Sequence, residues 1–122
     1  MPSPILIVDD SAIIVPRLQQ MLGDIAPSNP VFHAGDYAQA LLILQQSKPA
    51  FVFLDINLPG ANGIDLLRHL KKEIPSPIVI MLSNQSGDFY RSRCLALGAD
   101  YFIDKSTEFD LIPDIIRSRP PA

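Results

Sequence analysis

The segment Phe51–Gly60, with the sequence FVFLDINLPG, constrains the fold of this chain more than any other segment. Its first four residues are all apolar, and they include two aromatic residues and one β-branched residue. A short, wholly apolar segment of this kind is typical of a strand that is buried on both faces, as in a parallel sheet. The apolar run ends at Asp55, and a Pro59-Gly60 pair follows it closely. We therefore expect Asp55 at the carboxyl end of a strand, which is where open α/β sheets bind their ligands.

The composition is that of one globular domain, and we expect residues 1–122 to form it. Of the 122 residues, 48% are hydrophobic and 19% are charged, which is sufficient for a hydrophobic core. The net charge of −3 leaves no basic footprint for nucleic acid or an anionic membrane. No apolar run has spanning length, and no signal peptide is recognisable. The lone cysteine, Cys94, excludes an intramolecular disulfide and favours a reducing, cytoplasmic location.

Short apolar runs alternate with segments of helical periodicity along the chain. Strands are expected at Ile5–Val8, Val31–Ala34, Phe51–Asp55, Pro77–Leu82 and Tyr101–Ile103. Helices are expected after Ser11, at Tyr37–Gln46, Ile64–Ile74 and Asp88–Leu97, and within Phe109–Arg117. Loops are indicated by the pairs Pro59-Gly60 and Asn62-Gly63. Strict alternation requires parallel strands joined by right-handed crossovers. We predict an α/β fold, a doubly wound, flavodoxin-like five-stranded parallel sheet with strand order 2-1-3-4-5 and five helices.

Three local features of the expected helices can be tested against the structure. Pro16 falls inside the first helical pattern, where it should remove a hydrogen bond or kink the helix unless the regular turns start late. Cys94 is expected to be a small core residue. In the helix at 64–74, the core-facing side chains should be Leu67, Leu70 and Ile74. Its solvated face should comprise Arg68, Lys71 and Lys72.

Residues with useful chemistry follow four of the five expected strands. Asp9 and Asp10 follow the first strand, Asp55 ends the third, Ser83 follows the fourth, and Lys105 closes the fifth. The expected topology brings all of these strand ends to one edge of the sheet. Three carboxylates in one cleft repel each other unless a cation lies between them. Carboxylate oxygens are the ligands that Mg²⁺ prefers, so this edge is a candidate magnesium site.

The same set of groups suits phosphoryl transfer. The metal and the Lys105 ammonium would neutralise the phosphoryl oxygens, the Ser83 hydroxyl would donate to them, and Asp55 would attack in line. The alternative is that each residue is an ordinary helix cap or surface charge. That alternative explains any one residue, but it does not explain five suitable residues at four strand ends.

The chain resembles a bacterial response-regulator receiver domain over essentially its whole length. The resemblance depends on the Asp9-Asp10 pair, on Asp55 within FLDINLPGANG, on Ser83, and on Lys105 after GADYFID. It implies that Asp55 is the phosphoacceptor. It also implies that Mg²⁺ is held by Asp9 or Asp10, by Asp55 and by the backbone carbonyl of Asn57.

The resemblance further implies that Ser83 and Lys105 bind the phosphoryl oxygens, and we expect both to serve the phosphorylated state rather than the fold. Phe102 lies where the family has its switching aromatic residue, but it lacks the hydroxyl of a tyrosine, so its switch must work by packing. Receivers usually carry a cis proline after the lysine, whereas here Ser106 follows Lys105. A cis bond without proline costs roughly 3 kcal/mol, so this peptide is either trans or strained.

The implied partner is a histidine kinase or a histidine phosphotransfer protein. No enzymatic activity is expected beyond magnesium-dependent self-phosphorylation and self-dephosphorylation. Nothing after Arg117 resembles a linker or a DNA-binding segment, so we expect a stand-alone receiver. Its signal should leave through the fourth helix, fifth strand and fifth helix, to an output protein or a second copy of the chain. The expected outer residues of that face are Arg91, Leu95, Leu111 and Asp114.

Two alternatives of other classes remain open. A flavodoxin-like cofactor binder would need a phosphate-binding loop after the first strand, where the acids Asp9 and Asp10 would repel a phosphate. A phosphatase with an aspartyl nucleophile would need a general acid, but the residue two positions after Asp55 is Asn57. Repeated turnover of a generic phosphomonoester would favour the phosphatase.

Overall fold

A computed structural model of the chain describes residues 2–58, 61–84 and 88–119. Within these residues, a parallel sheet is formed by β1 (Ile5–Val8), β2 (Val31–Ala34), β3 (Phe51–Asp55), β6 (Ile78–Ser83) and β7 (Tyr101–Asp104). Its order is β2-β1-β3-β6-β7. Numbered in sequence among themselves, these strands have the predicted order 2-1-3-4-5, so the predicted topology is confirmed.

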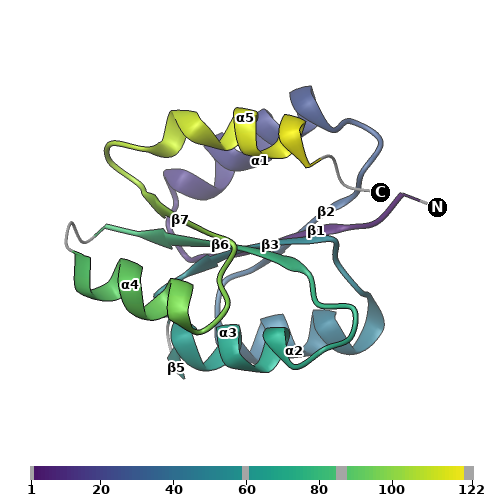
Figure 1. The fold of residues 1–122 in the computed structure, drawn as a ribbon. Coiled ribbons are helices and arrows are strands. Elements are labelled where there is room, and N and C mark those ends of the chain that lie inside the picture. Colours follow the sequence, from purple (N-terminus) through teal and green to yellow (C-terminus); the bar gives the residue numbers. More distant parts are fainter. Residues whose placement is uncertain (1, 59–60, 85–87, 120–122) are drawn as a thin grey trace.

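Helices cover both faces of the sheet (Figure 1). One face carries α1 (Ile14–Ile25) and α5 (Ile112–Ser118), which a short 3₁₀ turn, η1 (Phe109–Leu111), precedes. The other face carries α2 (Tyr37–Gln46), α3 (Gly63–Lys71) and α4 (Asp88–Ala96). The doubly wound prediction is therefore confirmed. None of these helices has the length and apolar composition that crossing a bilayer requires, among the residues that the structure describes.

A small hairpin between β3 and α3 was not predicted from the sequence. It consists of β4 (Asn57–Leu58) and β5 (Ala61–Asn62), which pair antiparallel. The Pro59-Gly60 pair that we expected to break the chain here lies outside the described residues. Two-residue strands contain too little periodicity to be recognised from sequence alone.

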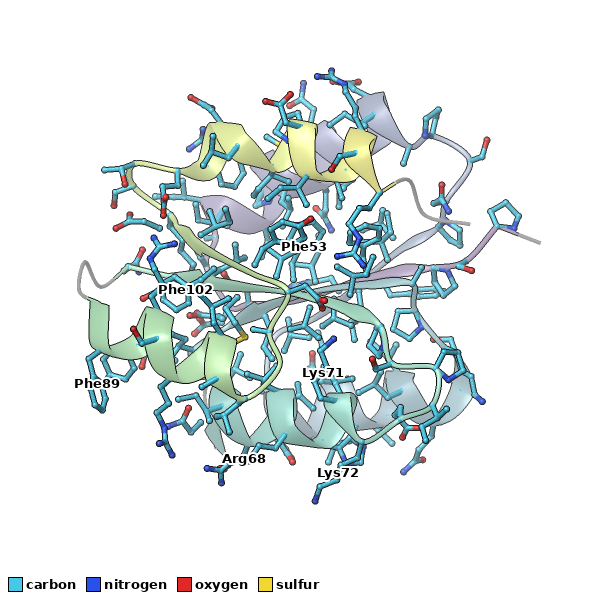
Figure 2. All side chains as sticks on the ribbon, viewed as in Figure 1. Phe53, Arg68, Lys71, Lys72, Phe89 and Phe102 are labelled. Carbon is cyan, nitrogen blue, oxygen red and sulfur yellow. The ribbon has the colours of Figure 1, made fainter. Side chains whose placement is uncertain are left out.

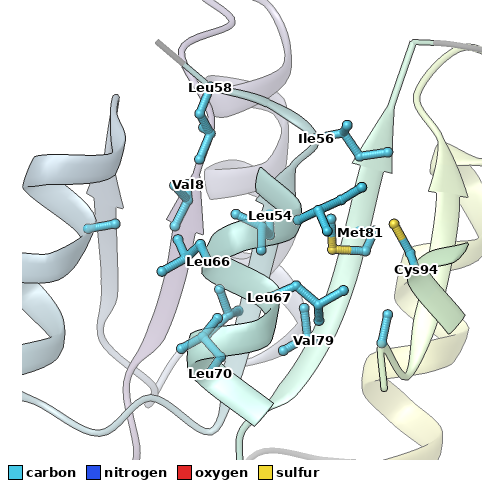
Figure 3. Close-up of a cluster of buried hydrophobic side chains, with 14 of the residues drawn as sticks. Val8, Leu54, Ile56, Leu58, Leu66, Leu67, Leu70, Val79, Met81 and Cys94 are labelled. Atoms are coloured by element: carbon cyan, nitrogen blue, oxygen red, sulfur yellow. The ribbon is translucent and has the colours of Figure 1, made fainter. Parts of the chain in front are cut away.

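The sheet separates two hydrophobic clusters, as two-sided strands require. Alternate residues of β3 face opposite sides: Phe51 and Phe53 pack under α1 and α5, and Val52 and Leu54 pack against the α2–α4 side. Figure 2 shows Phe53 between the sheet and the α1–α5 layer, and Figure 3 shows the opposite cluster around Leu54. Cys94 is completely buried in that second cluster, so its prediction as a core residue is confirmed.

The helix starts follow the expected chemistry. Regular turns of α1 begin at Ile14, so Pro16 lies in the first turn, where a missing N–H removes no intrahelical bond. Ser11 Oγ accepts hydrogen bonds from the backbone nitrogens of Ile13 (3.3 Å) and Ile14 (3.1 Å) just before that turn. The helix therefore starts late, as its proline requires.

The end of α3 differs from the sequence prediction. The helix stops at Lys71, and Ile74, which we expected in the core, is 93% exposed. Pro75 disfavours helical backbone at the residue before it, which explains the early stop. Lys71 is not on the solvated face: its Nζ lies 2.7 Å from Asp100 Oδ2 and 2.9 Å from the Pro77 carbonyl oxygen. Arg68 and Lys72 are exposed, as predicted, and they point away from the sheet in Figure 2.

Candidate functional site

The carboxyl edge of the parallel sheet brings the predicted site residues together. Asp55 is the last residue of β3, Ser83 is the last residue of β6, and Asp9 and Lys105 directly follow β1 and β7. The parallel register aligns Asp55 with Leu82 and aligns Ser83 with Asp104. A chain of neighbouring strand ends therefore positions these side chains, each at the point where its strand leaves the sheet.

Asp9, Asp10 and Asp55 form a compact carboxylate cluster. One oxygen of each residue lies within 4.8 Å of the others, and Asp9 and Asp55 are buried while Asp10 is exposed. Such a group of like charges is unfavourable in a partly buried cleft without a counter-charge. The structure provides one counter-charge from the chain itself.

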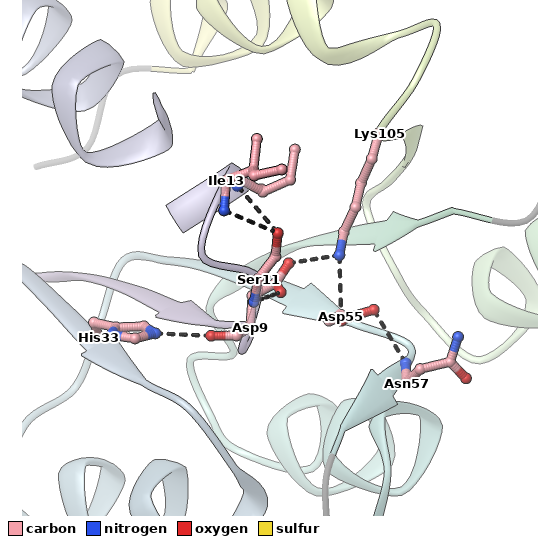
Figure 4. A network of polar contacts seen from close by, with 8 residues as sticks. Asp9, Ser11, Ile13, His33, Asp55, Asn57 and Lys105 are labelled. Carbon is pink, nitrogen blue, oxygen red and sulfur yellow. Dashed lines mark hydrogen bonds and ion pairs between the residues drawn. The ribbon is translucent and has the colours of Figure 1, made fainter. Parts of the chain in front are cut away.

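That counter-charge is the Lys105 ammonium, which reaches across the site from β7. Lys105 Nζ lies 2.7 Å from Asp9 Oδ2 and 3.2 Å from Asp55 Oδ2 (Figure 4). The lysine side chain is only 3% exposed, and its backbone nitrogen donates to the Ser83 carbonyl oxygen at 2.8 Å. We expected Lys105 to serve only the phosphorylated state. The ammonium is buried between two carboxylates, and its separate contributions to the fold and to the phosphorylated state stay a prediction.

The environment of Asp55 disfavours its ionised form. Burial is the largest cause, and the neighbouring Asp9 carboxylate adds to it, so the pKa of Asp55 rises from 3.8 to about 6. The Lys105 ammonium and the backbone N–H of Asn57, which donates to Asp55 Oδ1 at 3.1 Å, limit this rise. The carboxyl group is thus mostly ionised above pH 6, but its ionised form is less stable than that of an exposed carboxylate.

Asp9 is fixed by the chain yet keeps one oxygen without a hydrogen bond. Its Oδ1 accepts from the Ser11 nitrogen at 2.8 Å, and His33 Nε2 lies 2.7 Å from its backbone oxygen. His33 is thus a hydrogen-bonded histidine. Asp9 Oδ2 is buried and lacks a hydrogen bond of acceptable geometry, although the Lys105 ammonium lies 2.7 Å away. An oriented oxygen that accepts no hydrogen bond, beside two further carboxylates, fits the oxygen-rich ligand set of a hard divalent cation.

Gly63 is a structural requirement of the site that sequence analysis assigned only to a loop. A Cβ at this position would overlap the backbone oxygen of Asp55 and would lie 2.9 Å from Ile56 Cα. Gly63 also donates from its backbone nitrogen to the Ile56 oxygen at 2.7 Å. The absence of a side chain thus lets the start of α3 pack directly against the end of β3.

The loop that follows Lys105 begins with Ser106 and not with a proline. The single cis peptide among the described residues is Ile74–Pro75, so Lys105–Ser106 is trans. The Asp104 carboxylate organises the turn, because its Oδ1 accepts from the backbone nitrogens of Ser106 (2.7 Å) and Thr107 (3.2 Å). An aspartate that bonds its own following backbone is a recognised turn signal, so Asp104 marks this turn in the sequence.

Phe102 is buried on the α4 side of the sheet, and Arg91 covers it. The Arg91 guanidinium lies 5.0 Å from the Phe102 ring centroid, and its Nη1 donates to the Phe102 carbonyl oxygen at 3.0 Å. Our expectation that Arg91 belongs to the outer surface was therefore wrong in part, since its head group is used inside the chain. Leu95 and Leu111 are 45% and 49% exposed, and Asp114 is exposed, as expected.

Several known proteins resemble this chain in sequence. It is 28% identical over 116 residues to the Fimbriae Z protein of Salmonella typhimurium, covering 95% of this chain and 55% of that protein. It is 38% identical over 107 residues to a protein-glutamate methylesterase/protein-glutamine glutaminase of Treponema denticola, covering 83% of this chain and 28% of that protein. The chain thus spans about half, or less, of the length of these curated relatives.

Solved structures agree with these relatives. The signal receiver domain of a DNA binding response regulator from Colwellia psychrerythraea has a TM-score of 0.88 and 28% identity, over 95% of this chain and 96% of that one. The BeF3-activated N-terminal receiver domain of RstA from Klebsiella pneumoniae has a TM-score of 0.83 and 25% identity, over 95% and 97%. The family model of the response regulator receiver domain matches residues 5–117. This chain belongs to the response regulator receiver domain family.

Proposed function

We propose that the chain accepts a phosphoryl group on Asp55 from a histidine kinase or a histidine phosphotransfer protein, in a magnesium-dependent reaction. One observation carries this proposal. The Asp55 carboxylate lies at the carboxyl edge of the sheet within reach of the Asp9 and Asp10 carboxylates and of a buried ammonium, Lys105. The pattern combines a nucleophile, cation ligands and a counter-charge for phosphoryl oxygens in one place.

In the proposed reaction, an ionised Asp55 oxygen attacks the phosphorus atom of the donor. The new bond joins phosphorus to the Asp55 oxygen, and the bond to the donor's histidine nitrogen breaks, so the imidazole leaves with that electron pair. Because the pKa of Asp55 is about 6, the carboxylate is ionised and competent near pH 7.5. Lys105, now paired with both Asp9 and Asp55, would contribute its ammonium to the transferred oxygens, and the Ser83 hydroxyl would donate to another.

The residues that would hold Mg²⁺ are Asp9, Asp10, Asp55 and the backbone carbonyl of Asn57. When bound, Mg²⁺ neutralises the charge that gathers on the phosphoryl oxygens. Two features of Asp9 support this role. Its Oδ1 is oriented by the hydrogen bond from the Ser11 nitrogen, and its Oδ2 accepts no hydrogen bond. Asp55 Oδ1 is oriented in the same way by the Asn57 nitrogen.

We further propose that phosphorylation changes a face built from α4, β7 and α5, which then binds an output protein or a second copy of the chain. Phe102 on β7 would be the switching side chain. Leu95 on α4 and Leu111 beside α5 offer exposed apolar contacts for a partner. The chain matches only 28% of the length of the methylesterase relative, and we do not extend the esterase activity of that protein to this chain. Phosphorylation and dephosphorylation of its own Asp55 are the only reactions we propose for it.

Intact-mass analysis with acetyl phosphate tests the central claim. With Mg²⁺, the wild-type protein should gain the mass of one phosphoryl group. The Asp55→Asn variant should gain none, and chelation of the metal should abolish the gain in the wild type. Full modification of Asp55→Asn would place the phosphoacceptor elsewhere, and full modification in chelator would remove the metal from the mechanism.

A further inference from the structure

Three charged side chains that the proposed reaction does not use surround the loop that carries Lys105. They are Arg91 on α4, Asp104 at the end of β7, and Glu108 before η1, and we call them the loop brace. Asp104 is 8% exposed and directly precedes Lys105 in the chain. A buried carboxylate is unfavourable unless hydrogen-bond donors satisfy it, and the Asp104 carboxylate finds such donors in the loop that follows it.

Asp104 holds the loop immediately after the lysine. Its Oδ1 accepts hydrogen bonds from the nitrogens of Ser106 and Thr107, at 2.7 and 3.2 Å. Because the Lys105–Ser106 peptide is trans and carries no proline ring, the covalent structure leaves this loop free to turn. The two hydrogen bonds to Asp104 Oδ1 restrict the loop in place of a proline ring.

Glu108 holds the residue just before the lysine. Its Oε1 accepts from the Asp104 backbone nitrogen at 3.0 Å, and its own nitrogen donates to the Asp104 backbone oxygen at 2.9 Å. The same Oε1 pairs with Arg91 Nη2 at 2.5 Å. The hydrogen bond from the Asp104 backbone, followed by that from Arg91, lowers the pKa of Glu108, so its carboxylate remains charged at neutral pH.

Arg91 connects this loop to α4. It pairs with Glu108 and also donates from Nη1 to the Phe102 oxygen at 3.0 Å. The backbone on both sides of Lys105 is therefore tied down, and the nitrogen of Lys105 itself donates to Ser83. With its backbone fixed in this way, the lysine side chain extends directly between the Asp9 and Asp55 carboxylates.

We propose that the loop brace positions the Lys105 ammonium for phosphoryl transfer to Asp55, so that Arg91, Asp104 and Glu108 are positioning residues. Lysine is a flexible point charge, and its contribution at a transition state depends on where its backbone holds it. An error of about 1 Å in the position of a catalytic group can lower a rate by about 100-fold. This inference rests on the proposed phosphorylation of Asp55.

Phosphorylation kinetics with acetyl phosphate and saturating Mg²⁺ test the brace. Glu108→Ala should lower the rate constant about 10- to 100-fold, whereas Glu108→Gln, whose amide oxygen can still accept from the Asp104 nitrogen, should restore most of it. Asp110→Ala, an exposed carboxylate change in η1, is the matched control and should leave the rate unchanged. Magnesium affinity should be the same in all these proteins, because the brace supplies no proposed ligand.

The position of Lys105 is measured separately by NMR of the lysine ε-methylene groups, with the Lys105 signal assigned by its loss in Lys105→Arg. Glu108→Ala should shift that signal, and Asp110→Ala should not. An unchanged rate or an unchanged Lys105 signal in folded Glu108→Ala overturns the brace. If Glu108→Ala does not fold, Arg91→Ala is the second test, because the Arg91 side chain is 37% exposed and its removal takes away the ion-pair partner of Glu108. A wild-type protein that takes up no phosphate refutes the proposed function itself, which is a different result.

Discussion

Replacing Asp55 with asparagine is expected to stabilise the metal-free protein at neutral and alkaline pH. Burial, and then the Asp9 carboxylate, raise the pKa of Asp55 from 3.8 to about 6. The folded protein therefore binds a proton at Asp55 more tightly than the unfolded chain does. Above pH 6 the proton is lost in both states, and the folded state keeps a charge in an unfavourable place. Asparagine has nearly the same shape without that charge.

The magnitude follows from the two pKa values. Each tenfold change in a proton dissociation constant corresponds to about 1.36 kcal/mol, so the rise from 3.8 to about 6 lowers the free energy of unfolding by about 3 kcal/mol. This loss is complete above the folded-state pKa, diminishes as the pH falls from about 6 to about 4, and disappears below the unfolded-state pKa. Asp55→Asn should thus exceed the wild type by about 3 kcal/mol near pH 8 and match it near pH 3.5.

Urea unfolding in the presence of chelator, repeated across this pH range, measures the difference. Asp24→Asn is the control, because Asp24 is exposed on α1 and its replacement should change stability by less than about 0.5 kcal/mol at every pH. If Asp55→Asn is no more stable than the wild type near pH 8, the carboxylate is not in an unfavourable environment and the reasoning fails.

Magnesium should reverse most of this advantage. An ion that binds only the folded state stabilises it by about 2.7 kcal/mol at a concentration 100 times its dissociation constant. The wild type should receive this stabilisation, and Asp55→Asn, which lacks one charged ligand, should receive much less. The two proteins should then have nearly equal stability near pH 8. An undiminished difference would show that Asp55 does not take part in binding the ion.

Three further predictions test the frame around the site. Gly63→Ala should lower the free energy of unfolding by about 3 kcal/mol in urea titrations, because the new methyl group overlaps the Asp55 backbone oxygen; an unchanged midpoint would contradict that contact. Lys71→Ala should cost about 1.5 kcal/mol through the loss of its ion pair and hydrogen bond, whereas exposed Lys72→Ala should cost less than about 0.5 kcal/mol; equal effects would contradict the partners of Lys71. Beryllofluoride with Mg²⁺ should shift the amide signals of Phe102 as well as those near Asp55; shifts confined to the loops would move the output face elsewhere.

The fold could be predicted because its determinants are local. The apolar run Phe51–Leu54 and the helical repeat of Tyr37–Gln46 each reveal their type within a few residues, and the alternation of such segments leaves few topologies. The β4–β5 hairpin and the end of α3 could not be predicted in the same way. Ile74 was predicted to lie in the core from apolar spacing alone. Pro75 disfavours helical backbone at Ile74, and this restriction overrides the spacing.

The site could be predicted in part for a related reason. Parallel strands carry their last residues to one edge, so the order of Asp9, Asp55 and Lys105 in the sequence already implies that they meet. The burial of Lys105 does not follow from that order, because it depends on how the surrounding loops close over the side chain. The ion pair between Arg91 and Glu108 joins residues of α4 and the loop before η1, and no local periodicity marks such a contact.

Under the proposed function, Arg91 offers a route by which a change at Asp55 would reach α4. Phe102 aligns with Met81 of β6 in the parallel register, two residue pairs from the pair of Ser83 and Asp104. If Ser83 moves toward a phosphoryl group, the space beside the Phe102 ring changes first. Arg91 covers that ring and binds the loop of Lys105 through Glu108, so it contacts both parts of the site that would move. Under the proposed switch, a change in either contact would displace the Arg91 side chain, and α4, which carries it, would be biased accordingly.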